Sequence, residues 1–266
     1  MKSFFDVLFE ISNEDRFRIL VQIVDEPMNV TRLSNKLGLS LTETSRHLSR
    51  ILDVGLVVRD PDGYYRIDNF GMMLLSQLGG IEFVTNNREY FRTHSVTRLP
   101  PEFISRIGDL KNSTPVTDPM VFFHSVANGM QEAQEYIQVL VDQFVMSHVP
   151  ILKEALERNI ATKTIEPKVW VAPPSFYRIR EEAEKSWLKK AREANILEHR
   201  SLDVVDVYVH MSEREAALAF PTAEGRYDYL GFTCTDKKSL KFCSDLFDYY
   251  WKKAEPLIDP LRNFDP

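Results

Sequence analysis

The sequence predicts an α+β chain with an N-terminal winged helix-turn-helix over residues 1–70 and a C-terminal mixed α/β domain over residues 119–266. Two observations predict this organisation. Thr31–Asp68 reads as two helices separated by a tight turn and followed by two short strands. From Met120 onward, helical and strand patterns alternate and then give way to a run of strands. Residues 71–118 read as a helical connector and a candidate dimerisation segment.

The first supporting helix of the N-terminal part is expected from about Asn13 to Val24, with Ser12 as its cap. Helical spacing places Phe17, Leu20, Ile23 and Val24 on its inner face. A second helix holds Leu33 and Leu37, and Gly38 supplies the backbone freedom that a tight turn needs.

Ser40 is expected to cap a third helix, with Glu43 completing a capping box. The residues expected to face inward are Leu41, Thr44, Leu48, Ile51 and Leu52. The outward residues are small, polar and partly cationic, and they are Thr42, Glu43, Ser45, Arg46, Ser49 and Arg50. Ser and Thr reach phosphates or base edges, and Arg bonds guanine through two hydrogen bonds. The pattern therefore predicts a helix that reads the DNA major groove.

Gly55 is expected to end this helix, and a hairpin follows around the turn Arg59–Gly63. Arg59 and Arg66 flank the hairpin, where phosphates would lie. Residues 1–68 carry nine Lys or Arg and eleven Asp or Glu, a net charge of −2. Since DNA binding depends on cations that neutralise phosphates, the positive charge has to be local, and a dimer would double it. A three-helix domain that contacts protein instead of DNA remains the alternative.

The run SRHLSRILDVGLVVRDPDGYYRI resembles the ArsR-like winged-helix repressors of archaea and bacteria, over about the first 70 residues. Metal sensors of that superfamily use clustered Cys and His. No such cluster lies near this motif, and His47 is expected to pack or cap the helix. We therefore expect no metal site.

Overall composition is that of an ordinary cytoplasmic chain, with a net charge of −6 and no stretch of ~18 apolar residues. No signal peptide is visible at the start of the sequence. Residues 69–266 carry a net −4, so they are not expected to form a second nucleic-acid surface. Cys234 and Cys243 form no CxxC pair and are expected to be buried free thiols.

Phe70 to about Phe91 is helical in pattern, with a stripe of Phe70, Leu74, Leu78 and Ile81 that Gly79-Gly80 is expected to interrupt. The stripe could clamp a dimer or pack on its own winged helix, and both alternatives stay open. Further on, we expect a helix over Glu102–Leu110 and a loop over Lys111–Pro119.

The elements expected in the α/β domain are helices Met120–Gln134, Val149–Arg158, Arg178–Ala194 and Ser239–Ala254, and strands Tyr136–Val141, Thr164–Val171, Val204–His210, Ala216–Phe220 and Tyr227–Thr233. Open α/β sheets bind ligands at the carboxyl ends of their strands. The ligand-binding candidates on that rule are Asp142, Gln143, Trp170, Arg178, Tyr208, His210, Tyr227 and Asp228. Tyr208 could equally be a core aromatic residue, and Asp228 could pair with Arg226.

The segment RYDYLGFTCTDKKSLKFCSDLFDYYWKKAEPL, with EAALAFP before it and LPPEFISRIGDLKNS upstream, resembles the archaeal methanogenesis (filament-formation) regulatory proteins. The resemblance runs from about Arg98 to Pro256. That family joins an ArsR-like winged helix to an α/β domain and ends in a Leu-Phe-x-Tyr-Tyr-Trp helix, here Leu246–Trp251. It implies a cytoplasmic transcription regulator and names no effector.

Sensor domains of this kind also resemble degenerate phospholipase-D folds, whose catalysis needs a His-x-Lys pair. None of the six histidines here has a Lys two residues on. The sequence also lacks a GxxxxGKS loop, a GxSxG elbow and an HExxH helix. We therefore expect no catalytic residues and no cofactor.

The leading hypothesis is a homodimeric regulator that binds double-stranded DNA and senses a small-molecule effector or a protein signal, with no membrane partner. A second hypothesis makes the α/β domain an enzyme acting on a nucleotide or phosphodiester, with Asp142, His210 and Arg178 as its catalytic set. A third makes that domain an assembly surface without a ligand.

Overall fold

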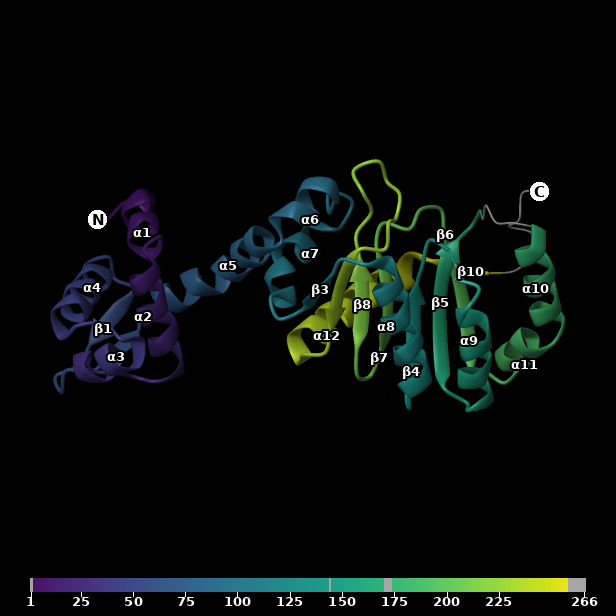
Figure 1. The fold of residues 1–266 in the computed structure, drawn as a ribbon, viewed down its shortest axis with the longest axis horizontal. Helices are drawn as coiled ribbons and strands as arrows, with labels where there is room; N and C mark the ends of the chain where they lie inside the picture. Colours follow the sequence, from purple (N-terminus) through teal and green to yellow (C-terminus); the bar gives the residue numbers. More distant parts are fainter. Residues whose placement is uncertain (1, 144, 170–173, 258–266) are drawn as a thin grey trace. The chain divides into compact units, whose positions relative to one another are not determined.

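The structure is a computed structural model that describes residues 2–143, 145–169 and 174–257. The chain forms two compact units, Met1–Gly79 and Gly80–Pro266. Helix α5 (Asn69–Asn86) begins in the first unit and ends in the second (Figure 1). The expected connector over 71–118 is therefore not a separate body, because its residues belong to the two units.

The first unit is a winged helix-turn-helix. It contains α1 (Phe4–Ile11), α2 (Glu14–Asp25), α3 (Val30–Leu37), α4 (Leu41–Asp53), β1 (Val57–Arg59) and β2 (Tyr65–Ile67). The two strands pair antiparallel, with Arg59 opposite Tyr65, and form the predicted wing. Gly38 ends α3 in the left-handed conformation, with a φ of 70°, as the tight turn requires. The predicted order of elements is confirmed.

Three expectations within this unit are wrong. The side chain of Asn13, and not that of Ser12, caps α2 by accepting from the backbone N–H of Arg16. Val24 is partly exposed, and Ile19 takes its place in the core. Leu41 is 55% exposed. It is the first residue of α4, where the helix has not yet packed against α2 and α3. His47 is buried instead, as a packing residue.

Gly79-Gly80 does not interrupt α5, which runs through both glycines. A Cβ on Gly80 would lie 3.3 Å from Cγ2 of Ile107, so glycine here permits close packing. Leu74 and Leu78 pack against the core of the winged-helix unit, whereas Ile81 is exposed. Packing on its own winged helix therefore accounts for part of the predicted stripe.

The second unit is a mixed α/β domain around one eight-stranded sheet. Its helices are α6 (Arg88–Thr93), α7 (Pro101–Ser105), the 3-10 turn η1 (Ile107–Leu110), α8 (Pro119–Glu132), α9 (His148–Glu157), α10 (Pro174–Lys185), α11 (Trp187–Glu193) and α12 (Lys237–Lys253). Its strands are β3 (Thr114–Val116), β4 (Tyr136–Leu140), β5 (Ala161–Pro167), β6 (Leu197–Leu202), β7 (Tyr208–Ser212), β8 (Ala216–Ala219), β9 (Gly231–Cys234) and β10 (Glu255–Pro256). The strand order is β10-β6-β5-β4-β7-β8-β9-β3, with β4, β5 and β6 parallel and the other neighbours antiparallel.

Several predicted boundaries in this unit are wrong. The expected loop over Lys111–Pro119 contains β3, and β6 was not expected at all. The single helix expected over Arg178–Ala194 divides at Ser186 into α10 and α11. Residues 227–230 form a loop, and β9 begins only at Gly231.

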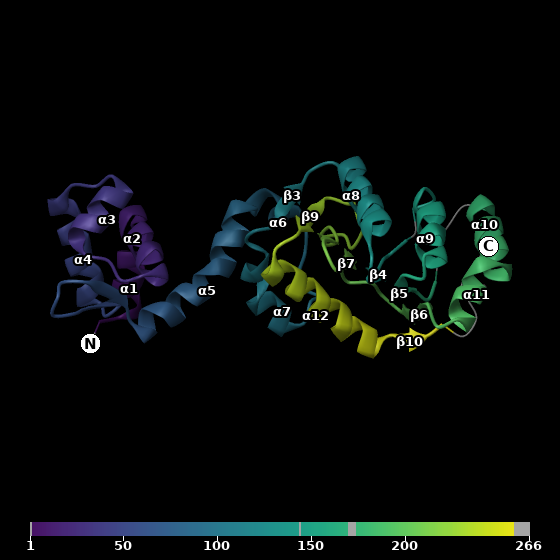
Figure 2. The ribbon, with the colours of Figure 1, turned by 90° about the horizontal axis from the view of Figure 1, so that it is seen from below.

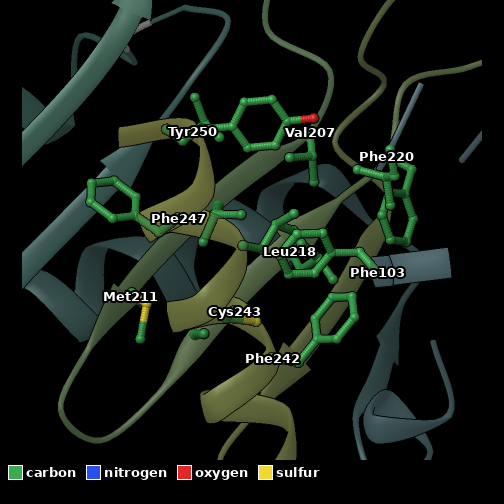
Figure 3. Close-up of a cluster of buried hydrophobic side chains, with 14 of the residues drawn as sticks. Phe103, Val207, Met211, Leu218, Phe220, Phe242, Cys243, Phe247 and Tyr250 are labelled. Atoms are coloured by element: carbon green, nitrogen blue, oxygen red, sulfur yellow. The ribbon is translucent and has the colours of Figure 1, made fainter. Parts of the chain in front are cut away.

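Helices cover both faces of the sheet, with α8 and α9 on one side and α7 and α12 on the other (Figure 2). The α12 side holds the larger core, in which Phe242, Cys243 and Phe247 pack on Met211 and Leu218 of the strands (Figure 3). Cys234 and Cys243 are both buried free thiols within this core, as expected.

Candidate functional site

Helix α4 is placed by its own N-terminal cap and by its buried face. The hydroxyl of Ser40 accepts from the backbone N–H of Glu43 at 3.2 Å, and the Glu43 carboxylate accepts from the backbone N–H of Ser40 at 3.1 Å. Thr44, Leu48 and Ile51 anchor the inner face in the core. The predicted capping box and most of the predicted inner face are therefore confirmed.

The outward residues of α4 line one side of a surface hollow that the start of α3 closes. The residues lining it are Val30, Thr31, Leu41, Thr42, Ser45, Arg46, Ser49 and Arg50. Five of these were predicted from the sequence as groove-reading side chains. Val30, Thr31 and Leu41 were not, although their place beside the helix-turn-helix turn could have indicated them.

The predicted DNA-contacting side chains differ in whether they are already paired with other side chains of the protein. The guanidinium of Arg50 donates to the Glu10 carboxylate at 2.7 and 2.9 Å. Glu43 is held in the capping box, and Arg66 pairs with Asp60 at 3.0 Å. By contrast, Arg46 is exposed and forms no ion pair within the described part of the chain. Arg46 is therefore the cation on this face that is ready to contact a phosphate or base.

Glu10 is the acidic residue that neutralises the charge of Arg50 on this face of α4. It also lies 3.0 Å from the buried Arg16, whose guanidinium donates to the backbone carbonyls of Phe9 and Glu10. The hydrogen bond from Arg50, together with the two positive charges, holds the pKa of Glu10 below its ordinary value. At neutral pH, Glu10 is thus ionised and holds Arg50 in an ion pair.

In the α/β unit, several predicted ligand residues meet at the carboxyl end of β4. We call Phe123, Asp142, Gln143, Tyr208, Tyr227 and Tyr229 the edge cluster. Asp142 is the second residue after the end of β4, and Tyr208 begins the neighbouring strand β7, where Leu140 pairs with Val209. Tyr227 and Tyr229 come from the loop before β9.

A short hydrogen-bond chain links three members of the edge cluster. The Tyr229 hydroxyl donates to the Asp142 carboxylate, 3.0 and 3.2 Å from its two oxygens. The Gln143 side-chain amide donates in turn to the Tyr229 hydroxyl. Burial raises the pKa of Asp142 to about 6, although these hydrogen bonds act in the opposite direction. Asp142 is thus a poorly solvated carboxylate that is mostly charged at neutral pH.

Tyr229 has a backbone φ of 59°, which a bulky residue seldom adopts. Its ring packs 4.7 Å from that of Phe123 on α8, and its hydroxyl is fixed on Asp142. Left-handed backbone at a non-glycine residue costs free energy and gathers at functional sites. Sequence reasoning did not select Phe123, and Tyr229 was not kept among the ligand-binding candidates because its local pattern reads equally as that of a core aromatic residue.

The remaining ligand candidates lie apart from the edge cluster. His210 is buried beneath α8, where a Cβ on Gly129 would lie 3.3 Å from its Cε1. Asp228 pairs with His94 at 3.0 Å and not with Arg226. Arg178 is exposed on α10. Trp170 lies outside the described residues.

Burial lowers the pKa of His210 to about 3, with the nearby His148 as a second cause. His210 is therefore neutral at physiological pH. Its Nε2 has no hydrogen-bond partner among the described residues. A neutral, deeply buried imidazole is poorly placed to act on a bound ligand.

A second polar group lies between the sheet and α10. Glu166 of β5 is fully buried and contacts Arg180 of α10 at 3.3 Å and His199 of β6 at 2.9 Å. Arg180 also contacts Glu184 at 3.1 Å, and Glu184 pairs with Arg192. These five side chains, which we call the buried ion network, fasten α10 and α11 to the sheet.

The cavity beside this network is too small for an effector. It is lined mainly by apolar side chains, with Thr164 and His199 at its polar side, and has a volume of about 30 Å³. A water molecule needs about 10–15 Å³ by this measure, so the space suits about two waters. The edge cluster is the better candidate for effector binding.

Two further searches of the described residues bear on function. No group of three or more His, Cys, Asp or Glu side chains that could hold a metal ion is found there. None of the described helices has the length and hydropathy needed to cross a membrane.

A helix-turn-helix with a wing and an exposed polar second helix defines the DNA-binding domain of a transcription regulator. Residues 13–58 match the family model described as bacterial regulatory protein, arsR family. The N-terminal domain of this chain is thus an ArsR-family helix-turn-helix. No curated protein matches the sequence.

Three solved structures are similar to the chain at low identity. The archaeal chromatin protein TrmBL2 is 17% identical over 92% of this chain and 94% of its own, with a TM-score of 0.44. NucT from Helicobacter pylori is 9% identical over 55% of this chain and 98% of its own, with a TM-score of 0.40. The phospholipase D family member Nuc from Salmonella typhimurium is 9% identical over 52% and 91%, with a TM-score of 0.39.

Proposed function

We propose that this chain is a homodimeric transcription regulator in which each copy places α4 in the major groove of one half-site. The observation that carries the proposal is the outward face of α4, on a helix-turn-helix that matches the ArsR family. Thr42, Ser45, Arg46 and Ser49 would contact base edges and phosphates, with Arg59 of the wing on the backbone. Arg50 and Arg66 would join after releasing Glu10 and Asp60.

A dimer is supported by apolar side chains that the described part of the chain leaves uncovered. Phe4, Phe5 and Phe9 of α1 are all more than 60% exposed, and so are Met73 and Ile81 of α5. Exposed apolar surface of this kind typically marks a protein interface. A two-fold dimer would also double the few cations available for phosphate contacts.

We further propose that the α/β unit binds an effector at the edge cluster. Binding there would change the spacing of the two recognition helices in a dimer, and so the affinity for the operator. Such a regulator would act in the cytoplasm, with the DNA. The resemblance to methanogenesis (filament-formation) regulatory proteins supports this arrangement and stays a prediction.

The α/β unit is proposed to act by binding and not by turnover. The enzymatic alternative needs Asp142, His210 and Arg178 to act together, whereas His210 is buried under α8 and neutral. Turnover of a generic phosphodiester that is lost in His210→Ala would support the enzyme instead. An assembly domain without a ligand would be supported if no small molecule binds at the edge cluster.

The experiment that tests the main proposal is selection of bound genomic DNA by the purified protein at a stated salt concentration. An enriched inverted repeat is the expected result, and its half-site spacing would report the dimer geometry. Binding that ignores sequence and disappears at modest salt would favour the protein-contact alternative for residues 1–70.

Arg46→Ala is expected to lower affinity for the selected DNA and to relax specificity at one base pair, by about 1–3 kcal/mol. The reason is that Arg46 is exposed on the α4 face and has no ion-pair partner among the described residues. Quantitative binding to the parent site and to single-base variants measures both effects. Lys2→Ala, which removes a positive charge from the same unit outside α4, is the control. Unchanged binding by Arg46→Ala would show that α4 is not the reading helix.

A further inference from the structure

Within the part of the chain that the structure describes, the charge of Asp142 has no cationic partner. Within the described residues its carboxylate accepts from the neutral Tyr229 hydroxyl and from backbone N–H groups, and it forms no ion pair with Lys, Arg or His. Outside those residues the sequence contains one cationic side chain, Arg262. A largely buried carboxylate is normally compensated by a cation, because burial without one is costly. The edge cluster therefore suits a ligand that brings positive charge.

Aromatic rings surround this carboxylate on the side of α8, β7 and the loop before β9. The ring of Tyr229 lies 4.7 Å from Phe123, 6.0 Å from Tyr208 and 6.3 Å from Tyr227, measured between ring centroids. Burial raises the pKa of all three tyrosines, and the charge of Asp142 raises it further, which places their hydroxyls within its electrostatic reach. Aromatic faces attract organic cations through the quadrupole of the ring, within about 6 Å of the centroid.

The hydroxyl of Tyr208 forms no hydrogen bond within the described residues, and it is not one of their fully buried unsatisfied atoms. Its side chain is 2% exposed, and burial together with the Asp142 charge accounts for its raised pKa, with no hydrogen bond from the described residues contributing. A ligand with a hydroxyl or ammonium N–H could therefore form a hydrogen bond with this hydroxyl.

Other ligand classes fit these groups less well. An anion would be repelled by Asp142, and a neutral ligand would leave its charge uncompensated. A hard divalent cation takes six or more oxygen ligands, whereas the described residues offer no cluster of three acidic or histidine side chains. An alkylated ammonium matches both the single carboxylate and the apolar rings.

We infer that the edge cluster binds a small organic cation of the alkylammonium class, with Asp142 as its counter-ion and Tyr208, Tyr227, Tyr229 and Phe123 as its aromatic surround. The inference rests on the proposed function, because it names the chemical class of the effector. The Gln143–Tyr229–Asp142 hydrogen-bond chain would orient the carboxylate toward the ligand.

The test uses the full-length protein, with choline as the probe and 3,3-dimethylbutan-1-ol as its uncharged isostere. Isothermal titration calorimetry is expected to give an affinity for choline at least about tenfold higher than for the alcohol. Asp142→Asn is expected to abolish that difference. Glu224→Gln, which removes a charge from an exposed turn in the loop that carries Tyr227 and Tyr229, is expected to retain it.

Acidic pH should weaken choline binding about tenfold between pH 7 and pH 5, because Asp142 protonates around pH 6. The other ionisable groups around it are Tyr208, Tyr227, Tyr229, His148 and His210. The raised pKa values of the three tyrosines and the pKa of about 3 of His210 keep these four groups neutral in this interval. Burial lowers the pKa of His148 below its ordinary value.

Three outcomes would overturn the inference: equal affinity for the alcohol, retention of choline binding by Asp142→Asn, or no binding of choline, tetramethylammonium or methylammonium. None of these would affect the DNA selection, which tests the regulator by itself. If choline binds but operator affinity stays unchanged, the edge cluster would still be a ligand-binding site, but it would not regulate DNA binding.

Discussion

At the scale of single residues, Arg50 shows how an intramolecular contact can set DNA affinity. Arg50 lies on the outward face of α4, yet its guanidinium is held in a two-bond contact by Glu10 of α1. A DNA phosphate has to displace Glu10 before it can use this cation. The contact with Glu10 thus makes part of an already small positive surface unavailable to DNA.

Glu10→Gln is expected to raise DNA affinity about threefold or more, because it removes the competing carboxylate and frees Arg50. Arg16 remains satisfied by the carbonyls of Phe9 and residue 10. If the freed Arg50 contacts one more phosphate, the slope of log K against log salt steepens by about 0.9. Binding titrations at several salt concentrations measure both quantities. Glu14→Gln, an exposed acid with no ion pair in the described residues, controls for net charge, and equal gains in both variants would contradict the prediction.

The buried charge of Asp142 lowers the stability of the α/β unit. Its pKa in the folded protein is about 6, above the ordinary value of 3.8, so its charge destabilises the fold as pH rises through this interval. Asp142→Asn is therefore expected to stabilise the α/β unit at pH 7.5, by on the order of 1–2 kcal/mol, and to have little effect near pH 4. Urea unfolding at the two pH values measures this, with the exposed Asp203→Asn as control. A destabilised Asp142→Asn at pH 7.5 would show that the carboxylate is compensated within the protein.

At the scale of elements, the buried ion network decides how α10 and α11 are attached. Glu166→Ala would leave Arg180 and His199 buried beside an empty position, at an expected cost of about 3–5 kcal/mol in the free energy of unfolding. Glu181→Ala, which removes an exposed pair on the same helix, is expected to cost about 0.5 kcal/mol or less. Urea unfolding followed by tryptophan fluorescence compares them, and equal costs would show that the network is not structural.

The pH dependence of this network follows from the lowered pKa of Glu166. Burial raises the pKa of Glu166, but the contacts with His199 and Arg180 lower it by a larger amount. The pKa therefore lies below its ordinary value of 4.5. The stabilisation is therefore present above about pH 4.5 and is lost as pH falls through the pKa of the folded state. The difference between Glu166→Ala and the parent should shrink in acid.

The sequence best predicts the elements whose signals come from residues close to one another in the chain. The cap at Ser40, the left-handed Gly38 and the apolar spacing of α4 each depend on neighbours within four residues, and they were located correctly. Strand β6 was missed because its inward positions include His199 and Ser201, which read as polar in a pattern search. Their burial depends on Glu166 and other distant partners, which no local pattern contains.

The same reason explains which residues of the edge cluster the sequence could indicate. Asp142, Gln143, Tyr208 and Tyr227 could be selected because the ends of strands are local features. Asp228 and His210 were also selected, yet His94 and Gly129, far away in sequence, decide where they lie. Ion pairs and close approaches between distant segments are what a single sequence does not reveal.

At the scale of the whole molecule, the two units have separate cores. Leu48 is fully buried in the winged-helix core, whereas all three tryptophans, Trp170, Trp187 and Trp251, belong to the second unit. Tryptophan fluorescence therefore reports the unfolding of the α/β unit, and circular dichroism reports both units.

Leu48→Ala is expected to destabilise the winged-helix unit by about 2–5 kcal/mol. It should therefore shift part of the transition seen by circular dichroism and leave the fluorescence transition unchanged. Glu166→Ala should do the opposite and move the fluorescence transition. A shift of the fluorescence transition in Leu48→Ala would show that the two units unfold as one.

The ends of the eight-stranded sheet bear on how copies of this protein can associate. Both outermost strands are very short, and each contains a proline, Pro115 in β3 and Pro256 in β10. A proline has no N–H to offer an incoming strand, and short edges give it little to pair with. Growth of the sheet from one molecule into the next is thus disfavoured. The proposed dimer is therefore not expected to form by pairing of these two edges, and crowded copies are protected from joining into extended β aggregates.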